Sequence, residues 1–427
     1  MHGTRWLVAL SVLIVLPLAS AAAKPPRVIS AKVFGDRLRG GWAGQMIGVS
    51  YGSVYEFHAL GKTIDGPIRP WKPEYVRNSL EQDDLYVEMT FLKVLEEKGI
   101  DATARQAGEA FRDSKYRLWH ANDAGRTNLR AGIFPPDSGR PRYNPHSDDI
   151  DFQIEADLFG LIAPGLFEAS GRLCDRFGTV MNSGDGLYGG RFVAAMYCQA
   201  YLEPEATAEA VARVVDAGLK AIPAESRYAQ LVRDVVAWHR QHPDDWRATW
   251  SKLEAKWAHE DLCPEGIDQP YNIDAKVNGG YIVIGLLHGG GDFDRTLEIT
   301  TRCGQDADCN PSSAAGVLGT VLGFSRIPAR YTDDFSSLTG RRFEYTDYDY
   351  PGLIAACERI ARKLVASEGG SVIEHDGGAL LMIPTQTPRP PATLEQLHPA
   401  SRADLKAALD EFQQRKARVE TGRPRER

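Results

Sequence analysis

Residues 304–319 read GQDADCNPSSAAGVLG, and they are the most informative part of the 427-residue chain. Asp306 and Asp308 stand one residue apart, ahead of Asn310, a good N-cap, and Pro311, which suits the first helical position. The residues that follow are small and mostly apolar, so a helix made of them can pack very closely against its neighbours. The stretch therefore predicts a buried central helix with two carboxylates held just before its N-terminus.

These carboxylates have two alternative explanations. Acids before a helix interact favourably with the partial positive charge of its N-terminus, which is the commoner case. Two carboxylates brought close together also repel each other, and a bound cation is their usual counter-charge. From this stretch alone, both explanations stay open.

A second acidic pair lies early in the chain. Gln82, Asp83 and Asp84 stand at the start of an amphipathic helix predicted over Glu81–Gly99. Taken alone, these residues cap the helix and interact with the partial positive charge of its N-terminus. Read together with the acids of residues 304–319, they supply the oxygen ligands from distant segments that magnesium prefers.

Three further acids are candidates for the same site. Glu56 lies between Tyr55 and Phe57, just after a glycine-rich helix predicted over Ala31–Gly48. It is either a solvated edge residue or a partly desolvated carboxylate with a raised pKa, as a general acid or base requires. Asp151 and Glu155 share a helical face and are weaker candidates.

Three other acids lie close to Asp151 and Glu155 in the sequence, and a glycine-rich segment follows them; neither is a candidate for the metal site. Asp148, Asp149 and Asp157 are expected at the surface or at helix caps. The glycine-rich segment Asn182–Phe192, with Asp185, Tyr188 and Arg191, is expected to be a loop that lines a pocket.

The rest of the chain is overwhelmingly helical by its periodicity, with aromatic residues at helical spacing between Glu203 and His259. Ser371–Pro384 predicts a short hairpin that turns at residues 376–378. Leu394–Val419 predicts a charged helix before a polar tail.

The N-terminus has the pattern of a signal peptide, with Arg5, an apolar core over Trp6–Leu18 and alanine-rich cleavage sites before Lys24. We expect a secreted or periplasmic protein without a membrane span once residues 1–23 are removed. The net charge of −7 argues against nucleic acid as a partner.

Six cysteines in an exported chain permit disulfides. Cys303 and Cys309 flank the two late aspartates, and they either bridge that loop or are small buried side chains.

At this point three motifs resemble those of the ADP-ribosylglycohydrolases, in the same order and over roughly residues 33–328. The family's G-D-x-x-G-x-x-x-E motif is similar to Gly48–Glu56, its T-D-D motif to Gln82–Asp84, and its G-x-D-x-D-T motif to Gly304–Cys309. The resemblance implies an all-α fold, a single compact orthogonal helical bundle over residues 28–366. The hairpin, a linker and the charged helix and tail that the sequence pattern predicts follow it within residues 367–427.

The resemblance also implies a metal-dependent glycosyl hydrolase that holds one or two Mg²⁺ or Mn²⁺ ions. The implied ligands are Gln82, Asp83, Asp84, Asp306, Asp308 and Cys309, and the implied catalytic residues are Glu56 and Asp84. Three positions depart from the family pattern, because Gln82 and Cys309 replace threonines and Val49 replaces an acid; a thiol is a poor ligand for magnesium. The expected reaction is cleavage of an N- or O-glycosidic bond in an ADP-ribosyl or related sugar substrate, which is a small molecule or a glycosylated one. The alternatives are a carbohydrate or nucleoside glycosidase on the same fold and a catalytically degenerate protein that only binds its ligand.

Overall fold

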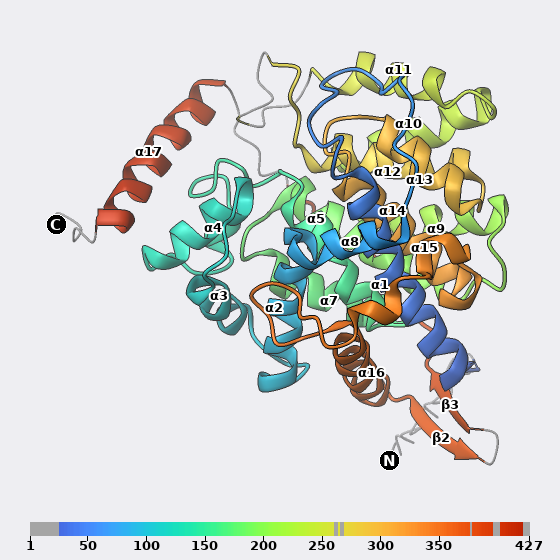
Figure 1. The fold of residues 1–427 in the computed structure, drawn as a ribbon. Coiled ribbons are helices and arrows are strands. Elements are labelled where there is room, and N and C mark those ends of the chain that lie inside the picture. Colours follow the sequence, from blue (N-terminus) through green and yellow to red (C-terminus); the bar gives the residue numbers. More distant parts are fainter. Residues whose placement is uncertain (1–24, 260–263, 265–268, 376–377, 396–401, 422–427) are drawn as a thin grey trace, which may run out of the picture.

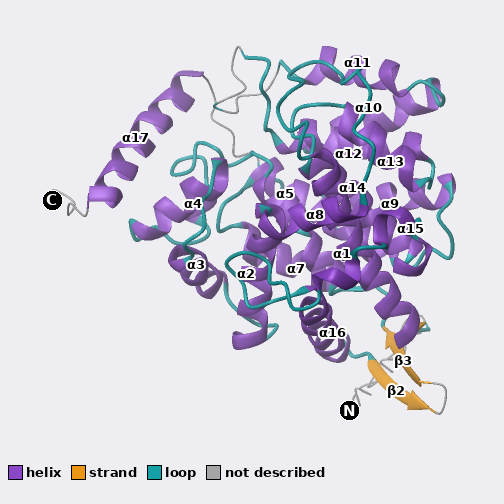
Figure 2. Cartoon of the chain, in the orientation of Figure 1, coloured by secondary structure: helices purple, strands orange, loops and turns teal. Residues whose placement is uncertain are grey.

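In the computed structural model of this protein, the described residues are 25–259, 264, 269–375, 378–395 and 402–421. Helices dominate them, and a small three-stranded sheet lies at one end (Figures 1 and 2). The all-α prediction, with a C-terminal hairpin and an extra helix, is confirmed.

The bounds of the elements are as follows: β1 Arg27–Ser30, α1 Ala31–Gly52, α2 Asp83–Lys98, α3 Ala104–Asp113, α4 His120–Arg130, α5 Asp151–Glu155, α6 Asp157–Leu161, α7 Phe167–Gly178, α8 Gly184–Ala200, α9 Ala208–Lys220, α10 Arg227–Gln241, α11 Trp246–Trp257, α12 Ala275–Gly289, α13 Phe293–Arg302, α14 Cys309–Leu322, α15 Ala329–Thr332, α16 Tyr350–Ser367, β2 Ser371–His375, β3 Gly378–Ile383 and α17 Arg402–Thr421.

Two helices rich in small residues, α1 and α14, pack against each other in the centre of the molecule (Figure 1). From Gly40 to Gly52, a glycine occurs at every fourth position of α1, and each of these four glycines faces the backbone of α14 or of the residues that flank it. A Cβ atom on Gly44 would lie 2.1 Å from the carbonyl oxygen of Ala315, and one on Gly48 would lie 2.2 Å from that of Pro311. The close approach predicted from the small residues is therefore present, and it depends on the missing side chains.

The start of α14 differs from the prediction by two residues. The helix begins at Cys309, with Asp308 at the N-cap position, and not after Asn310. The backbone N–H of Cys309 donates to Oδ1 of Asp306 at 3.4 Å, so Asp306 caps the helix from outside. Asn310 donates instead to the side chain of Asn278 in α12 at 2.8 Å.

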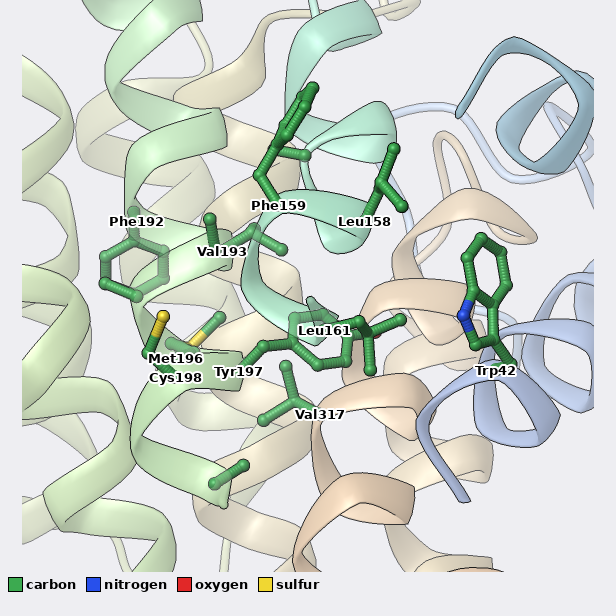
Figure 3. Close-up of a cluster of buried hydrophobic side chains, with 14 of the residues drawn as sticks. Trp42, Leu158, Phe159, Leu161, Phe192, Val193, Met196, Tyr197, Cys198 and Val317 are labelled. Carbon is green, nitrogen blue, oxygen red and sulfur yellow. The ribbon is translucent and has the colours of Figure 1, made fainter. Parts of the chain in front are cut away.

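The apolar core surrounds this central pair. Figure 3 shows one part of it, where Tyr197 of α8 lies near Leu161 of α6 and Val317 of α14. Most of the apolar residues predicted to be core between residues 203 and 259 are buried, among them Tyr228, Leu231 and Trp257. One tightly packed core thus holds most of the helices, and this rigid frame positions the loops that carry the acids.

Two predictions about the middle of the chain are wrong. The segment Asn182–Phe192 is not a loop: α8 begins at Gly184, and Arg191 is buried against Asp175 of α7, with 2.6 Å between Nη1 and Oδ1. Asp148, Asp149 and Asp157 are all buried and not at the surface. The glycines that suggested a loop serve helix packing, since a Cβ on Gly190 would clash with Phe152 at 2.3 Å.

The cysteines in the described residues are free thiols, namely Cys174, Cys198, Cys303, Cys309 and Cys357. A bridge between Cys303 and Cys309 is therefore not formed, and both are small buried side chains. Cys263 lies outside the described residues.

The sheet pairs β1, near the start of the described chain, with the late hairpin of β2 and β3, in the order β1-β3-β2 with antiparallel pairing throughout. The strands β2 and β3 confirm the predicted hairpin, while residues 376–377 of its turn lie outside the described residues. The C-terminal helix α17 packs on α4, where Arg415 donates to Asn128 Oδ1 at 2.7 Å. Among the described helices, none has the length and apolar character needed to cross a bilayer. The predicted signal peptide, residues 1–23, lies outside the described residues.

Candidate metal and active site

A cavity of about 240 Å³ lies where the loop after α1 and the starts of α2, α4, α5 and α14 meet. Its described lining holds carboxyl groups from distant parts of the chain, namely Glu56, Glu81, Asp83, Asp151, Glu155, Asp306 and Asp308. Gln82 and Cys309 also line it. Every predicted site residue except Asp84 thus borders a single cavity, and Asp84 lies next to it.

The late acids form a compact group. One ligand atom from each of Asp306, Asp308 and Cys309 lies within 4.8 Å of the other two. Cys309 joins this group to the early pair, because its Sγ lies 3.1 Å from Oδ1 of Asp84. The structure therefore brings together the early and the late acidic pairs, 225 residues apart.

Burial and mutual repulsion raise the pKa values of these acids above the ordinary carboxyl range. Loss of hydration, followed by the charges of Asp308 and Asp151, raises the pKa of Asp83 to about 6. The pKa values of Asp84 and Asp306 are raised well above the ordinary carboxyl value, again by burial first and then by neighbouring acids. Without a positive charge nearby, these carboxyl groups therefore keep their protons to a higher pH than an isolated carboxyl group.

Glu56 sits at the mouth of the cavity, four residues after the end of α1. A Cβ on Gly52 would lie 1.9 Å from the carbonyl oxygen of Ala307, so this close contact fixes the chain before Glu56 against the loop of Asp306 and Asp308. Directly after Glu56, the N–H of Phe57 donates to the carbonyl of Gln305 at 2.9 Å and ties the chain to the same loop. The residue is exposed as a whole. Its carboxyl group nevertheless loses hydration beside the acids, and this loss, with the charges of Asp308 and Asp83, raises its pKa to about 8.

Asp151 and Glu155 of α5 also line the cavity, and the start of α4 holds them. The backbone N–H groups of Ala121 and Asn122 donate to the two carboxylate oxygens of Asp151, at 3.1 and 2.9 Å. The side-chain amide of Asn122 donates to Glu155. Asp151 thus caps a helix other than its own, which the sequence spacing does not show.

The sequence analysis missed His120, the first residue of α4, which lines the cavity. It has a left-handed backbone, with φ of 39°. Its Nε2 lies 3.1 Å from the hydroxyl of Tyr271, and its Nδ1 lies 3.9 Å from Oδ2 of Asp149. His146 lies 2.8 Å from the same Asp149 oxygen, so these three residues form a second polar group beside the cavity. A lone histidine among polar residues carries no spacing signal that could have identified it.

The side chains of the acidic group suit a hard divalent cation. Oδ2 of Asp84 and Oδ1 of Asp308 are buried and have no hydrogen-bond partner in the described protein. Such oxygens are costly unless another group satisfies them, and carboxylate oxygens are the ligands that Mg²⁺ and Mn²⁺ prefer. Cys309 fits less well, because burial, together with Asp306 and Asp308, raises its pKa well above the ordinary thiol value and keeps the proton on sulfur.

The fold and the cavity define a class: all-helical proteins in which acids before two helix N-termini meet at one carboxylate-lined site. The chain belongs to the ADP-ribosylglycohydrolase family, whose family model, described as "ADP-ribosylglycohydrolase", matches residues 30–366. The resemblance stated from the three motifs is therefore confirmed.

Other comparisons add less. A solved chain titled "ADP-ribosylglycohydrolase-related protein complex" is 17% identical, with a TM-score of 0.49, and the match covers 77% of this chain and 99% of that chain. A comparison with curated proteins finds no match.

Proposed function

We propose that this protein is an exported, metal-dependent glycosyl hydrolase that cleaves an N- or O-glycosidic bond. Membership of the family supports a glycohydrolase-type activity. The observation that carries the metal dependence is the meeting of four buried or half-buried aspartates, from two distant segments, with two unpartnered carboxylate oxygens among them.

The metal ligands would be Asp83, Asp84, Asp306 and Asp308, with Gln82 and Cys309 beside them. A bound Mg²⁺ or Mn²⁺ ion supplies positive charge that orients substrate oxygens and stabilises charge developing on them. Gln82 can offer its amide oxygen, since its Nε2 already donates to Asn78 at 3.0 Å. Asp84 has a second role in this proposal, because it links the late acids to the start of α2.

Glu56 is the proposed acid-base residue. At the mouth of the cavity its ionised form can accept a proton from a water molecule that attacks the anomeric carbon, while the leaving group takes up a proton from solvent as the glycosidic bond breaks. A pKa of about 8 places this group near the pH at which an acid-base residue works best.

Replacement of one late aspartate tests the proposal. Asp306→Asn removes a charge at the centre of the group, so we expect loss of Mg²⁺ binding by calorimetry and loss of turnover in a glycosidase screen with metal added. Asp347→Asn is the control, since Asp347 is exposed and away from the cavity. Full activity and metal binding in Asp306→Asn would refute the assignment.

The second candidate function is a ligand-binding protein without catalysis. The engagement of Cys309 as a hydrogen-bond donor to Asp84 favours it, because a thiol in this role contributes no hard ligand. Metal and sugar binding without any cleavage would support this alternative. Mass spectrometry of the mature N-terminus tests export: we expect a chain that begins at about residue 24.

A further inference from the structure

His120, His146 and Asp149 form a compact group of their own beside the cavity. One ligand atom from each lies within 4.8 Å of the other two. Asp149 is fully buried and His146 is 6% exposed, whereas His120 borders the cavity. Two imidazoles and one carboxylate form a ligand set that suits a transition metal such as Zn²⁺, while Mg²⁺ takes oxygen ligands.

The distances within the group are close to those around a tetrahedral zinc ion. Bonds of about 2.0–2.1 Å to zinc place neighbouring ligand atoms about 3.3 Å apart. Oδ2 of Asp149 lies 2.8 Å from Nδ1 of His146 and 3.9 Å from Nδ1 of His120. Shifts of about 0.5–0.6 Å bring both distances to the zinc value.

A hydrogen bond accounts for only one of these two contacts. Nδ1 of His146 and Oδ2 of Asp149 are at hydrogen-bond distance, so they form a buried histidine–carboxylate pair. The 3.9 Å between Nδ1 of His120 and the same oxygen is too long for a hydrogen bond. Two metal–ligand bonds of about 2.0–2.1 Å span this distance. An ion at this place would therefore coordinate both histidines and replace the hydrogen bond of the pair.

The second ring nitrogen of His120 is also held. Its Nε2 lies 3.1 Å from the hydroxyl oxygen of Tyr271. In proteins, a histidine that binds a metal almost always donates its other N–H group to an oxygen, and this bond fixes the ring and its tautomer. When Nε2 donates to Tyr271, Nδ1 of His120 keeps its lone pair on the side of Asp149.

Hydrogen bonds hold the backbone around the three ligands. His146 and Asp149 are the ends of one turn, in which the N–H of Asp149 donates to the carbonyl of His146 at 3.0 Å. The side chain of Asn144 donates to the carbonyl of Ala121, the second residue of α4, at 3.0 Å. The side chain of Asn182 donates to the carbonyl of Asp149 at 2.8 Å. Such outer contacts position metal ligands before the ion binds.

We infer that His120, His146 and Asp149 bind one Zn²⁺ ion, at a site distinct from the proposed magnesium site. Three protein ligands leave the fourth position of a tetrahedral ion for a water molecule. The bound ion joins the start of α4 to the loop before α5, and so fixes the N–H groups that hold Asp151 in the cavity. This inference does not depend on the proposed hydrolase activity.

Calorimetry with Zn²⁺ tests the inference on the full chain, treated with a chelator and then saturated with Mg²⁺. We expect one Zn²⁺ ion to bind per chain, because imidazole ligands favour Zn²⁺ over Mg²⁺. His120→Ala should weaken Zn²⁺ binding by about 100-fold and change Mg²⁺ affinity by less than about threefold. His58→Ala is the control, since His58 is exposed and outside the cavity lining, and it should bind Zn²⁺ as the natural protein does.

Two conservative variants keep the test independent of folding. Tyr271→Phe retains all three ligands and removes only the hydroxyl beside Nε2 of His120, so Zn²⁺ affinity should fall by about tenfold. Asp149→Asn keeps the size of the side chain and removes its charge, so the affinity should fall by about 100-fold. Zn²⁺ should raise the Tm of the natural protein and leave that of Asp149→Asn unchanged.

A variant of the acidic group tells the two metal sites apart. We expect Asp306→Asn to retain Zn²⁺ binding. Zn²⁺ binding that is lost in Asp306→Asn and retained in His120→Ala would place the ion among the aspartates and overturn the inference. Equal Zn²⁺ affinities of the natural protein, His120→Ala and Asp149→Asn, or no Zn²⁺ binding at all, would overturn it as well. The hydrolase proposal is tested separately, by Mg²⁺ binding and turnover in Asp306→Asn.

Discussion

The thiol of Cys309 donates a hydrogen bond to Oδ1 of Asp84, at 3.1 Å, and so joins the first turn of α14 to the first turn of α2. This contact links the two acidic pairs. The donor is an unusual choice, because burial and the acids Asp306 and Asp308 keep the thiol protonated. A hydroxyl at this position could donate to Asp84 and also offer an oxygen to a hard cation.

We therefore expect Cys309→Thr to bind Mg²⁺ about tenfold more tightly than the natural protein. Cys309→Ala is the matched variant, since it removes the donor without supplying an oxygen, and we expect it to bind less tightly than the natural protein. Calorimetry with Mg²⁺ measures both. Equal affinities for the Thr and Ala variants would mean that residue 309 is not near the ion.

The parts of this site that sequence could predict depend on short-range patterns. The acids of residues 83–84 and 306–308 stand before helices whose starts can be recognised from local composition, and the small residues of α14 indicate close packing. The buried position of Asp151 depends instead on N–H groups of α4, 29 and 30 residues earlier in the chain. His120 reaches the cavity through a left-handed backbone that no periodicity reveals. The error at Gly184 has a similar cause, because glycines serve loops and helix packing alike.

Replacement of the proposed acid-base residue separates catalysis from metal binding. We expect Glu56→Gln to lower kcat by roughly 100- to 10,000-fold while Mg²⁺ affinity is retained, because Glu56 lies at the mouth and the ligand aspartates lie deeper. Glu81→Gln, another carboxylate of the rim, is the control and should retain most of the activity. If Glu56→Gln lost Mg²⁺ binding as well, this residue would be a ligand and not the acid-base group.

The raised pKa values predict how stability depends on pH without metal. Burial raises the pKa of Asp157 to about 7, and Asp83 and Glu56 have values of about 6 and 8. Carboxyl groups in an unfolded chain titrate near pH ~4, so the folded protein holds more protons than the unfolded one between pH ~4 and ~8. The stability should therefore fall as pH rises through this range. A fully buried group such as Asp157 contributes at most about 1.4 kcal/mol per pH unit to this fall.

Thermal unfolding, with and without millimolar Mg²⁺, measures this effect. A cation binds the ionised carboxylates, so we expect Mg²⁺ to raise Tm more at about pH 8 than at about pH 5.5. Asp306→Asn should lose this added stabilisation. A Tm that rises with pH in the absence of metal would contradict the predicted sign.

The glycines of α1 predict a stability effect that also reaches the site. A Cβ on Gly48 would lie 2.2 Å from the Pro311 carbonyl oxygen, and this atom belongs to the backbone and has no rotamer that could relieve the clash. Gly48→Ala must therefore push α1 and α14 apart, at a cost of about 3 kcal/mol, measured as the change in the free energy of unfolding in urea. Gly66→Ala is the control, because nothing lies within 4 Å of its added Cβ, and its effect should stay within about 0.5 kcal/mol. Gly48 packs against the start of α14, next to the loop that carries Asp306 and Asp308. If the Gly48→Ala variant folds, it should therefore also bind Mg²⁺ more weakly. Unchanged stability in this variant would show that the two helices are not held at the close distance on which the geometry of the acids depends.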